Sequence, residues 1–137
     1  MKRKKIPPSL RNLVAERAAF RCAYCRILES DFYDAFQIDH IISQKHGGAA
    51  ELDNLAFSCP DCNRYKGSDI ATFMGTPPVL TTLFNPRKEV WKAHFEVKDG
   101  LMLALTPVAE ATIRLLRLND PDRVILRSEM IKQNRFY

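Results

Sequence analysis

Two pairs of cysteines, each pair separated by two residues, carry the clearest chemistry in this sequence. Cys22 and Cys25 form the first pair, and Cys59 and Cys62 form the second. Each CxxC supplies two sulfur atoms from one tight turn, and four thiolates in a tetrahedral arrangement are typical of structural Zn²⁺. A closed four-cysteine site leaves no open position for a substrate, so we expect this metal to be structural. The alternatives are four unligated buried thiols or a redox CxxC, and a redox motif needs no second pair.

A second group of polar residues lies between and just after the cysteine pairs. Asp39 and His40 are adjacent, and Asn63 directly follows the last cysteine. A carboxylate and an amide oxygen suit a hard divalent cation such as Mg²⁺ or Mn²⁺, which also accepts phosphate oxygens. His40, unligated and able to be neutral at pH 7, suits a general base. The dipeptide alone is weak support, because a core histidine bonded to a backbone carbonyl would look the same.

The elements predicted around these residues would bring them together. Alternating residues over 36–40 predict a short strand that ends at the Asp-His pair, and 55–58 predict a second strand. Pro60 suits the first turn of a helix, and Gly67 suits its end. This strand–loop–strand–helix order would carry Asn63 back across the hairpin toward the Asp-His pair.

Further elements are expected on both sides of this unit. Ser9 is expected to cap an N-terminal helix whose apolar residues recur at helical spacing. An alternating stretch around Asp99-Gly100 predicts a β-hairpin with a two-residue turn.

The C-terminal extension, residues 79–137, is interpreted as core and docking surface that carries no chemistry. Pro107 and Pro121 suit the first turns of two helices within it. Four arginines that alternate with apolar residues are expected to form a solvated helix face: Arg114, Arg117, Arg123 and Arg127.

Length and composition limit the class of protein. A chain of 137 residues with 46% hydrophobic residues is sufficient for one globular domain. It contains no apolar run near the roughly 20 residues that span a bilayer, so no membrane partner is expected. Pro7-Pro8-Ser9 follows the basic start where a signal peptide would need apolar residues, which favours a cytoplasmic location. In a reducing compartment, paired cysteines favour a metal over disulfides.

The net charge of +5 is unevenly distributed. The first 30 residues carry eight Lys and Arg against Glu16 and Glu29, whereas the remainder carries 13 against 14 acidic residues. A basic N-terminal third favours a polyanionic partner. For Lys2–Lys5 the alternative is a solvated tail with no partner.

Taken together, residues 22–66 resemble the HNH endonuclease family, the ββα-metal (His-Me finger) nucleases, in their four-cysteine, zinc-stabilised form. The strings at 45–48 and 52–55 also match the loop of that family. The resemblance implies hydrolysis of DNA phosphodiester bonds. Many members have His where this chain has Asn63, and an amide oxygen there favours Mg²⁺ or Mn²⁺ over Zn²⁺ or Ni²⁺ as the catalytic ion.

The resemblance also implies a role for each motif residue. His40 would be the base that activates water, while Asp39 and Asn63 would hold the catalytic metal. Asn54 would hold the loop that orients the base. The cationic residues expected near phosphate are Arg64 and Lys66.

We therefore expect an α+β fold with a ββα-metal unit stapled by a Cys₄ zinc site, an N-terminal helix, and a C-terminal β-hairpin plus two helices. The chain is expected to be a single HNH domain over 1–137, with its core at 22–70. Double-stranded DNA is the expected substrate, and the sequence indicates no oligomeric state. The alternatives are a zinc-dependent nucleic-acid-binding module that does not cut, and a zinc-organised protein-interaction domain.

Overall fold

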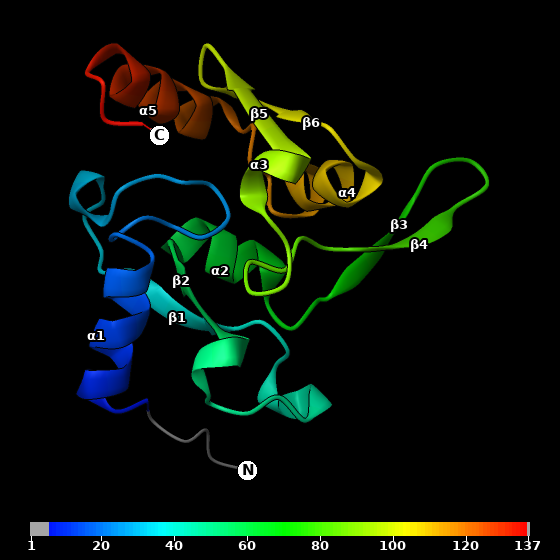
Figure 1. The fold of residues 1–137 in the computed structure, drawn as a ribbon. Coiled ribbons are helices and arrows are strands. Elements are labelled where there is room, and N and C mark those ends of the chain that lie inside the picture. Colours follow the sequence, from blue (N-terminus) through cyan, green and yellow to red (C-terminus); the bar gives the residue numbers. More distant parts are fainter. Residues whose placement is uncertain (1–5, 137) are drawn as a thin grey trace.

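The predicted strand–loop–strand–helix order is present in the computed structural model, which describes residues 6–136. The basic tail at Lys2–Lys5 lies outside the described residues. Figure 1 shows the β1–β2 hairpin beside α1 and α2, with α5 and the β5–β6 hairpin at the opposite end. The helices and strands are α1 (Pro8–Arg17), β1 (Gln37–His40), β2 (Leu55–Ser58), α2 (Pro60–Lys66), β3 (Ala71–Met74), β4 (Val79–Thr82), α3 (Trp91–His94), β5 (Phe95–Lys98), β6 (Leu101–Ala104), α4 (Pro107–Leu115) and α5 (Pro121–Lys132).

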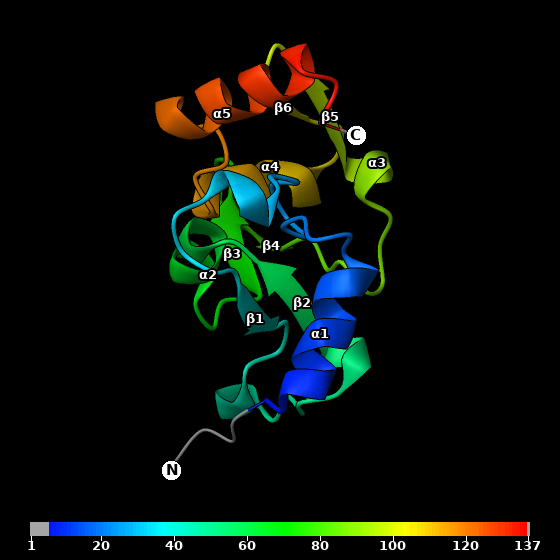
Figure 2. The same cartoon turned by 90° about the vertical axis from the view of Figure 1, so that its left-hand side faces the viewer.

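The first hairpin sets the positions of the central polar residues. β1 and β2 pair antiparallel, with Asp39 opposite Ala56 and His40 opposite Leu55. All four residues of β2 are buried. Figure 2 shows this hairpin between α1 on one side and α2 on the other. The residues of β2 therefore belong to the core. Strand β1 lies beside α2 (Figure 2).

Helix α2 begins and ends where the sequence predicts. Cys59 is its N-cap, with the sulfur accepting a hydrogen bond from the Cys62 N–H at 3.3 Å, and Pro60 occupies the first turn. Gly67 follows the last turn with a positive φ of 52°. Proline at the start and glycine after the end are the residues that those positions favour.

The N-terminal helix begins two residues earlier than predicted. Pro7 is the N-cap and Pro8 the first helical residue, so Ser9 lies inside the first turn and does not cap it. Proline's fixed φ suits the first helical position, which explains the earlier start. Val14 and Ala15 form the buried face of the helix, while Leu13 is exposed.

A second hairpin, β3–β4, was not predicted. Its strands pair from Ala71 opposite Thr82 to Met74 opposite Val79. Figure 1 shows the hairpin extending away from the rest of the protein. Apolar side chains such as Phe73 and Leu80 are exposed on it, so the strands lack the half-buried alternation that identifies a strand from sequence.

The C-terminal extension has the predicted hairpin and helices. Asp99 and Gly100 both have positive φ, 53° and 85°, as a primed two-residue turn requires. Thr106 caps α4 by accepting a hydrogen bond from the Ala109 N–H at 3.1 Å. A Cβ on Gly100 would lie 2.3 Å from the Val124 carbonyl oxygen, because α5 packs directly on this turn.

The prediction of a solvated arginine face is wrong for two of its four members. Arg114 and Arg117 are exposed, but Arg123 is 4% exposed and Arg127 is fully buried. Arg127 donates to the Gly100 carbonyl at 2.8 Å and to the Leu118 carbonyl at 2.5 Å. Backbone carbonyls of other segments accept hydrogen bonds from both guanidinium groups, which a helical pattern alone does not reveal.

Buried apolar residues from both halves of the chain form one core cluster, which includes the four cysteines. The division into a core unit and an extension within one domain stays a prediction. Within residues 6–136, no helix combines the length and the apolar character needed to cross a membrane.

Candidate metal sites and polar pocket

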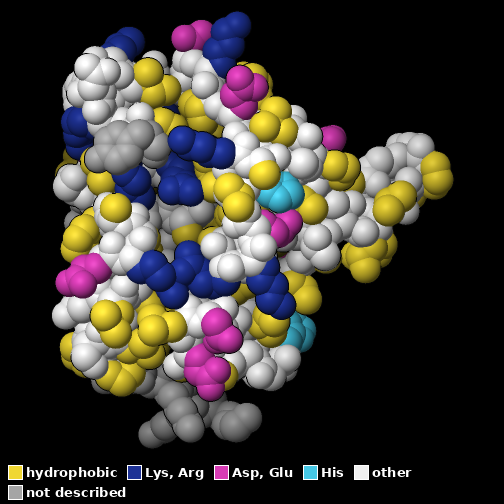
Figure 3. Space-filling view, viewed as in Figure 1, with side chains coloured by type: hydrophobic (Ala, Val, Ile, Leu, Met, Phe, Trp, Pro, Cys, Tyr) yellow, Lys and Arg dark blue, Asp and Glu magenta, His cyan; other side chains and the backbone are white. Residues whose placement is uncertain are grey.

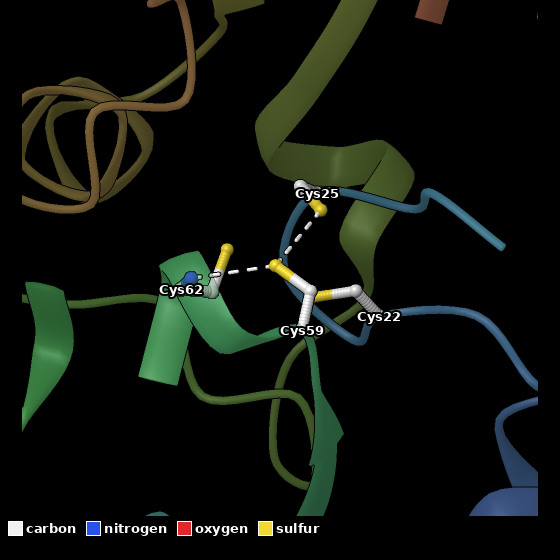
Figure 4. Close-up of side chains that lie close together, drawn as sticks. All are labelled: Cys22, Cys25, Cys59 and Cys62. Carbon is white, nitrogen blue, oxygen red and sulfur yellow. Dashed lines mark hydrogen bonds between the residues drawn. The ribbon is translucent and has the colours of Figure 1, made fainter. Parts of the chain in front are cut away.

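The four cysteines converge, and their sulfur atoms all lie within 4.8 Å of one another. Cys22 and Cys25 come from the turn after α1, while Cys59 and Cys62 come from the β2–α2 junction. Figure 4 shows the four side chains drawn together, with the Cys25 and Cys59 sulfurs 3.7 Å apart. All four residues are buried, and the structure has no disulfide among them. Four converging sulfurs of this kind are compatible with structural zinc.

A buried arginine from the C-terminal extension contacts this cluster. Arg123 on α5 donates through Nη2 to the Cys62 sulfur at 2.7 Å and lies 3.8 Å from that of Cys59. Burial alone would lower the pKa of Arg123, but the negative charge of the thiolates raises it. A guanidinium in this position offsets the negative charge of a tetrathiolate site. The sequence interpretation missed this residue, and its only signal was an i, i+4 pair of arginines, Arg123 and Arg127, on a helix with apolar neighbours.

Burial, the other cysteines and Arg123 all change the pKa of the Cys25 thiol. Burial alone would raise the pKa of Cys25, but hydrogen bonds with Cys22, Cys59 and Cys62, together with the charge of Arg123, bring it well below its usual value. A thiolate is the form of cysteine that binds metals.

Asp39, His40 and Asn63 line one polar cavity of about 160 Å³, which lies beside β1, the middle of α2 and the two residues that follow α2. The structure therefore brings together the three residues predicted for a base and a hard-metal site. Ile38, Gly67 and four polar residues that the sequence did not indicate as site residues complete the lining; the polar ones are Gln37, Ser43, Gln44 and Ser68.

Gln37 has a direct contact with one of the predicted ligands. Its side-chain oxygen accepts a hydrogen bond from the Asn63 amide nitrogen, which leaves the Asn63 oxygen as a potential ligand. The period of two along a strand places Gln37 on the same face as Asp39, and this periodicity was the available signal.

Asp39 is held in place by two buried neighbours. It is 4% exposed, and its Oδ2 accepts a hydrogen bond from the Tyr24 hydroxyl at 2.7 Å. The Lys66 ammonium lies 3.2 Å from the same oxygen. Burial raises the pKa of Asp39, whereas the charge of Lys66 and the Tyr24 hydrogen bond partly offset that rise. Tyr24 lies between the first two cysteines, so it links the cysteine turn to this carboxylate.

Lys66, for which the family resemblance implies a place near phosphate, is buried. It is 2% exposed, and besides Asp39 it donates to the Ile41 carbonyl at 3.1 Å. Arg64, by contrast, is exposed. A contact between Lys66 and phosphate would require the ammonium to leave Asp39 and the carbonyl.

Arg64 forms part of an exposed cationic stack. Its guanidinium lies 4.8 Å from the centre of the Tyr65 ring, and that of Arg117 lies at the same distance. Arg64 also lies 3.6 Å from Asp61 on the same helix. Arg117 follows α4, so the C-terminal extension adds a positive charge beside α2 that the sequence did not indicate.

Asn54 closes the loop that follows His40. Its side-chain oxygen accepts a hydrogen bond from the Ile42 N–H, and its amide nitrogen donates to the carbonyls of Ile42 and Ala49, each at 2.9 Å. A Cβ on Gly48 would lie 1.7 Å from the Ile42 carbonyl oxygen, so only glycine fits there. Asn54 does not line the polar cavity, and its role in orienting the base stays a prediction.

Replacing Asn54 by Ala is expected to lower the free energy of unfolding by about 1–3 kcal/mol, because the polar groups of Ile42 and Ala49 lose their partner. Chemical denaturation of the zinc-loaded protein measures this change. Asp53→Ala, at the exposed neighbouring position, is the control and should change stability little. Equal stability of the two variants would contradict the assignment.

Comparison with known protein families matches residues 22–69 to the HNH endonuclease family. The matched range contains both cysteine pairs and the residues that line the polar cavity. No curated protein and no solved structure matches the chain. The resemblance inferred from the sequence is thus confirmed: residues 22–69 carry the HNH endonuclease motif, with a four-cysteine cluster that fits its zinc-stabilised form.

Proposed function

We propose that this protein is a metal-dependent endonuclease that hydrolyses phosphodiester bonds of double-stranded DNA. The observation that carries the proposal is the shared cavity of Asp39, His40 and Asn63 inside the HNH match. A base and two oxygen ligands around one cavity are the minimum that metal-assisted hydrolysis of a phosphodiester needs.

In this proposal the β1–β2–α2 segment is a ββα-metal unit. Asp39 and Asn63 would hold Mg²⁺ or Mn²⁺, which when bound would stabilise the charge on the scissile phosphate and the leaving oxygen. Asp39 fits this role, because each carboxylate oxygen can accept more than one interaction and Lys66 and Tyr24 fix its orientation. Their contacts set the direction of the carboxylate before any ion binds.

His40 would remove the proton from the attacking water. It is the last residue of β1, and its backbone pairs with Leu55 of β2, so the main chain at this position is fixed by the hairpin. The loop that follows is held by Asn54. These two restraints would limit the movement of the imidazole, as general-base catalysis requires.

Arg64 would contact a phosphate outside the cavity. Its side chain is exposed, and its guanidinium lies over the Tyr65 ring. A planar guanidinium can donate two hydrogen bonds to one phosphate group. Lys66 would act on the Asp39 carboxylate instead, unless DNA binding releases its ammonium.

Cleavage of supercoiled plasmid with and without Mg²⁺ or Mn²⁺ tests the proposal. Ion-dependent conversion to open-circular or linear DNA would support it. Binding of DNA with no conversion under any ion would favour the zinc-dependent binding module. Absence of both binding and cleavage would favour the protein-interaction domain.

We also propose that the four cysteines bind one structural Zn²⁺ and that Arg123 strengthens that site. Arg123→Gln should lower zinc affinity about 10- to 100-fold, the usual effect of removing an outer hydrogen-bond partner of a metal ligand. Competition with a chromophoric chelator at pH 7 measures the affinity.

Lys132→Gln is the matched control for Arg123. It makes the same charge change on the same helix, at a side chain that is 70% exposed, and should leave zinc affinity unchanged. An equal loss in both variants would mean that net charge, and not the contact with Cys62, is responsible.

A further inference from the structure

A second cavity, separate from the Asp39–His40–Asn63 pocket, has a strongly basic lining. It lies between the end of α1, the first cysteine turn and the segment 84–91, and its volume is about 290 Å³. The two cavities share no lining residue. Figure 3 shows Lys and Arg side chains gathered across the middle of this face of the protein. The charged lining residues are Arg17, Arg21, Arg26, Arg87 and Glu89.

The single acidic residue in this lining is already engaged elsewhere. Glu89 Oε1 accepts a hydrogen bond from the Asn85 N–H at 2.9 Å, and Oε2 lies 3.1 Å from Nε2 of His94. Glu89 therefore does not neutralise the arginines around the cavity. None of Arg17, Arg26 and Arg87 forms an ion pair within residues 6–136.

The three arginines come from different segments and have different freedom to bind a ligand. Both terminal nitrogens of Arg17 donate to backbone carbonyls, those of Leu52 and Leu55, so its main contribution is charge. The Arg26 guanidinium lies over Trp91, 4.9 Å from the ring centre.

Compared with Arg17, the Arg87 guanidinium has fewer hydrogen-bond partners within the described residues. Its Nε is buried and has no hydrogen-bond partner in the described part of the chain, and the same holds for the Nε of Arg26. Burial lowers the pKa of Arg87. Burial, and to a smaller extent the charge of Arg87, lowers the pKa of Arg17. Positive charges that line a shared cavity and form no ion pair of their own are stabilised by an anion.

We propose that this cavity binds a phosphate group of the nucleic-acid backbone, with Arg87 and Arg26 as donors and Arg17 and Arg21 adding charge. Phosphate fits because it is an anion that accepts several hydrogen bonds, and arginine's planar group matches its oxygens. The inference rests on the proposed function: the Asp39 pocket would hold the scissile phosphate, and this cavity would anchor a flanking one.

The cavity contains its own spectroscopic probe. Trp91 lines it and is the single tryptophan of the chain, so intrinsic fluorescence reports on its surroundings. We expect a saturable change when a short DNA duplex is added to the full-length, zinc-loaded protein at low salt, without added Mg²⁺ or Mn²⁺. Inorganic phosphate titrated alone tests whether a free anion binds equally well.

Arg87→Gln and Lys88→Gln form a matched pair. Both remove one positive charge, but Lys88 is exposed and does not line this cavity. Arg87→Gln should weaken DNA binding about tenfold and reduce the slope of log K against log salt by about 0.9, the value for one lost phosphate contact. Lys88→Gln should have a clearly smaller effect, and Arg87→Lys should restore the slope but not the full affinity.

Equal effects of Arg87→Gln and Lys88→Gln, or none from either, would overturn the proposal. A second result would also overturn it: inorganic phosphate gives a saturable tryptophan response, while DNA gives none and does not compete with the phosphate. The ligand would then be a free anion. Plasmid cleavage is scored separately. DNA binding that depends on Arg87, without cleavage, would overturn the proposed function and support this phosphate site. Cleavage together with DNA binding that does not depend on Arg87 would support the proposed function and overturn this site.

Discussion

Replacing His40 by Ala is expected to lower the rate of DNA cleavage by about 10²- to 10⁴-fold, the usual effect of losing a general base. DNA affinity should persist, because Asp39, Asn63 and the exposed arginines are unchanged. His40 is only half-buried at the end of β1, so truncation should leave the hairpin intact. The measurements are single-turnover cleavage at saturating Mg²⁺ or Mn²⁺ and equilibrium DNA binding. Cleavage at the rate of the parent protein would remove His40 from the mechanism.

Asn63→Ala is the companion variant that separates base loss from metal loss. It removes one proposed metal ligand while leaving His40 in place, so part of its defect should be recovered at high Mg²⁺ or Mn²⁺. The defect of His40→Ala should not respond to the metal concentration. If Asn63→Ala shows no shift in metal dependence, Asn63 serves only its hydrogen bond with Gln37.

Removal of zinc is expected to unfold the segment from the first cysteine turn to α2. The site joins the turn after α1 to the β2–α2 junction, and all four cysteines belong to the core cluster. Binding of structural zinc is worth on the order of 10 kcal/mol, as much as the whole stability of many small domains. Circular dichroism during chelation should therefore show a cooperative loss of structure, and re-addition of Zn²⁺ should restore it.

Elemental analysis supplies the control for this experiment. Protein purified without added metal should contain about one zinc per chain. The fluorescence of Trp91 gives a local readout, because its indole nitrogen donates to the Tyr24 carbonyl in the first cysteine turn at 2.9 Å. A protein without zinc whose spectra are those of the folded state would contradict the proposed structural site.

Much of the local structure follows from residues that are close in the sequence. The CxxC spacing, Pro60 and Gly67 at the ends of α2, and the Asp99-Gly100 turn depend on backbone preferences and short-range hydrogen bonds. Such features can be predicted from a single sequence, because each residue acts on its immediate neighbours. The HNH motif could also be recognised from the sequence, through its residue types and spacing, and the family match confirms the resemblance.

The exposed β3–β4 hairpin shows where this approach fails. Its apolar side chains do not face a core, so burial does not impose the alternation by which a strand is identified. Ser9 failed as a cap for a related reason, since Pro8 was equally suited to begin the helix and the two signals compete.

The charged residues around the candidate sites depended on tertiary structure. The family resemblance implies that Lys66 lies near phosphate, and the structure shows that it is buried against Asp39, 27 positions away. Arg123 reads as part of a solvated face, yet it contacts Cys62, 61 positions away. A charge can be buried only where oppositely charged or hydrogen-bonding groups meet it, and those partners come from distant segments. The sequence thus determined which chemical groups this protein has available, whereas folding determined which of them face a ligand and which serve to hold the others in place.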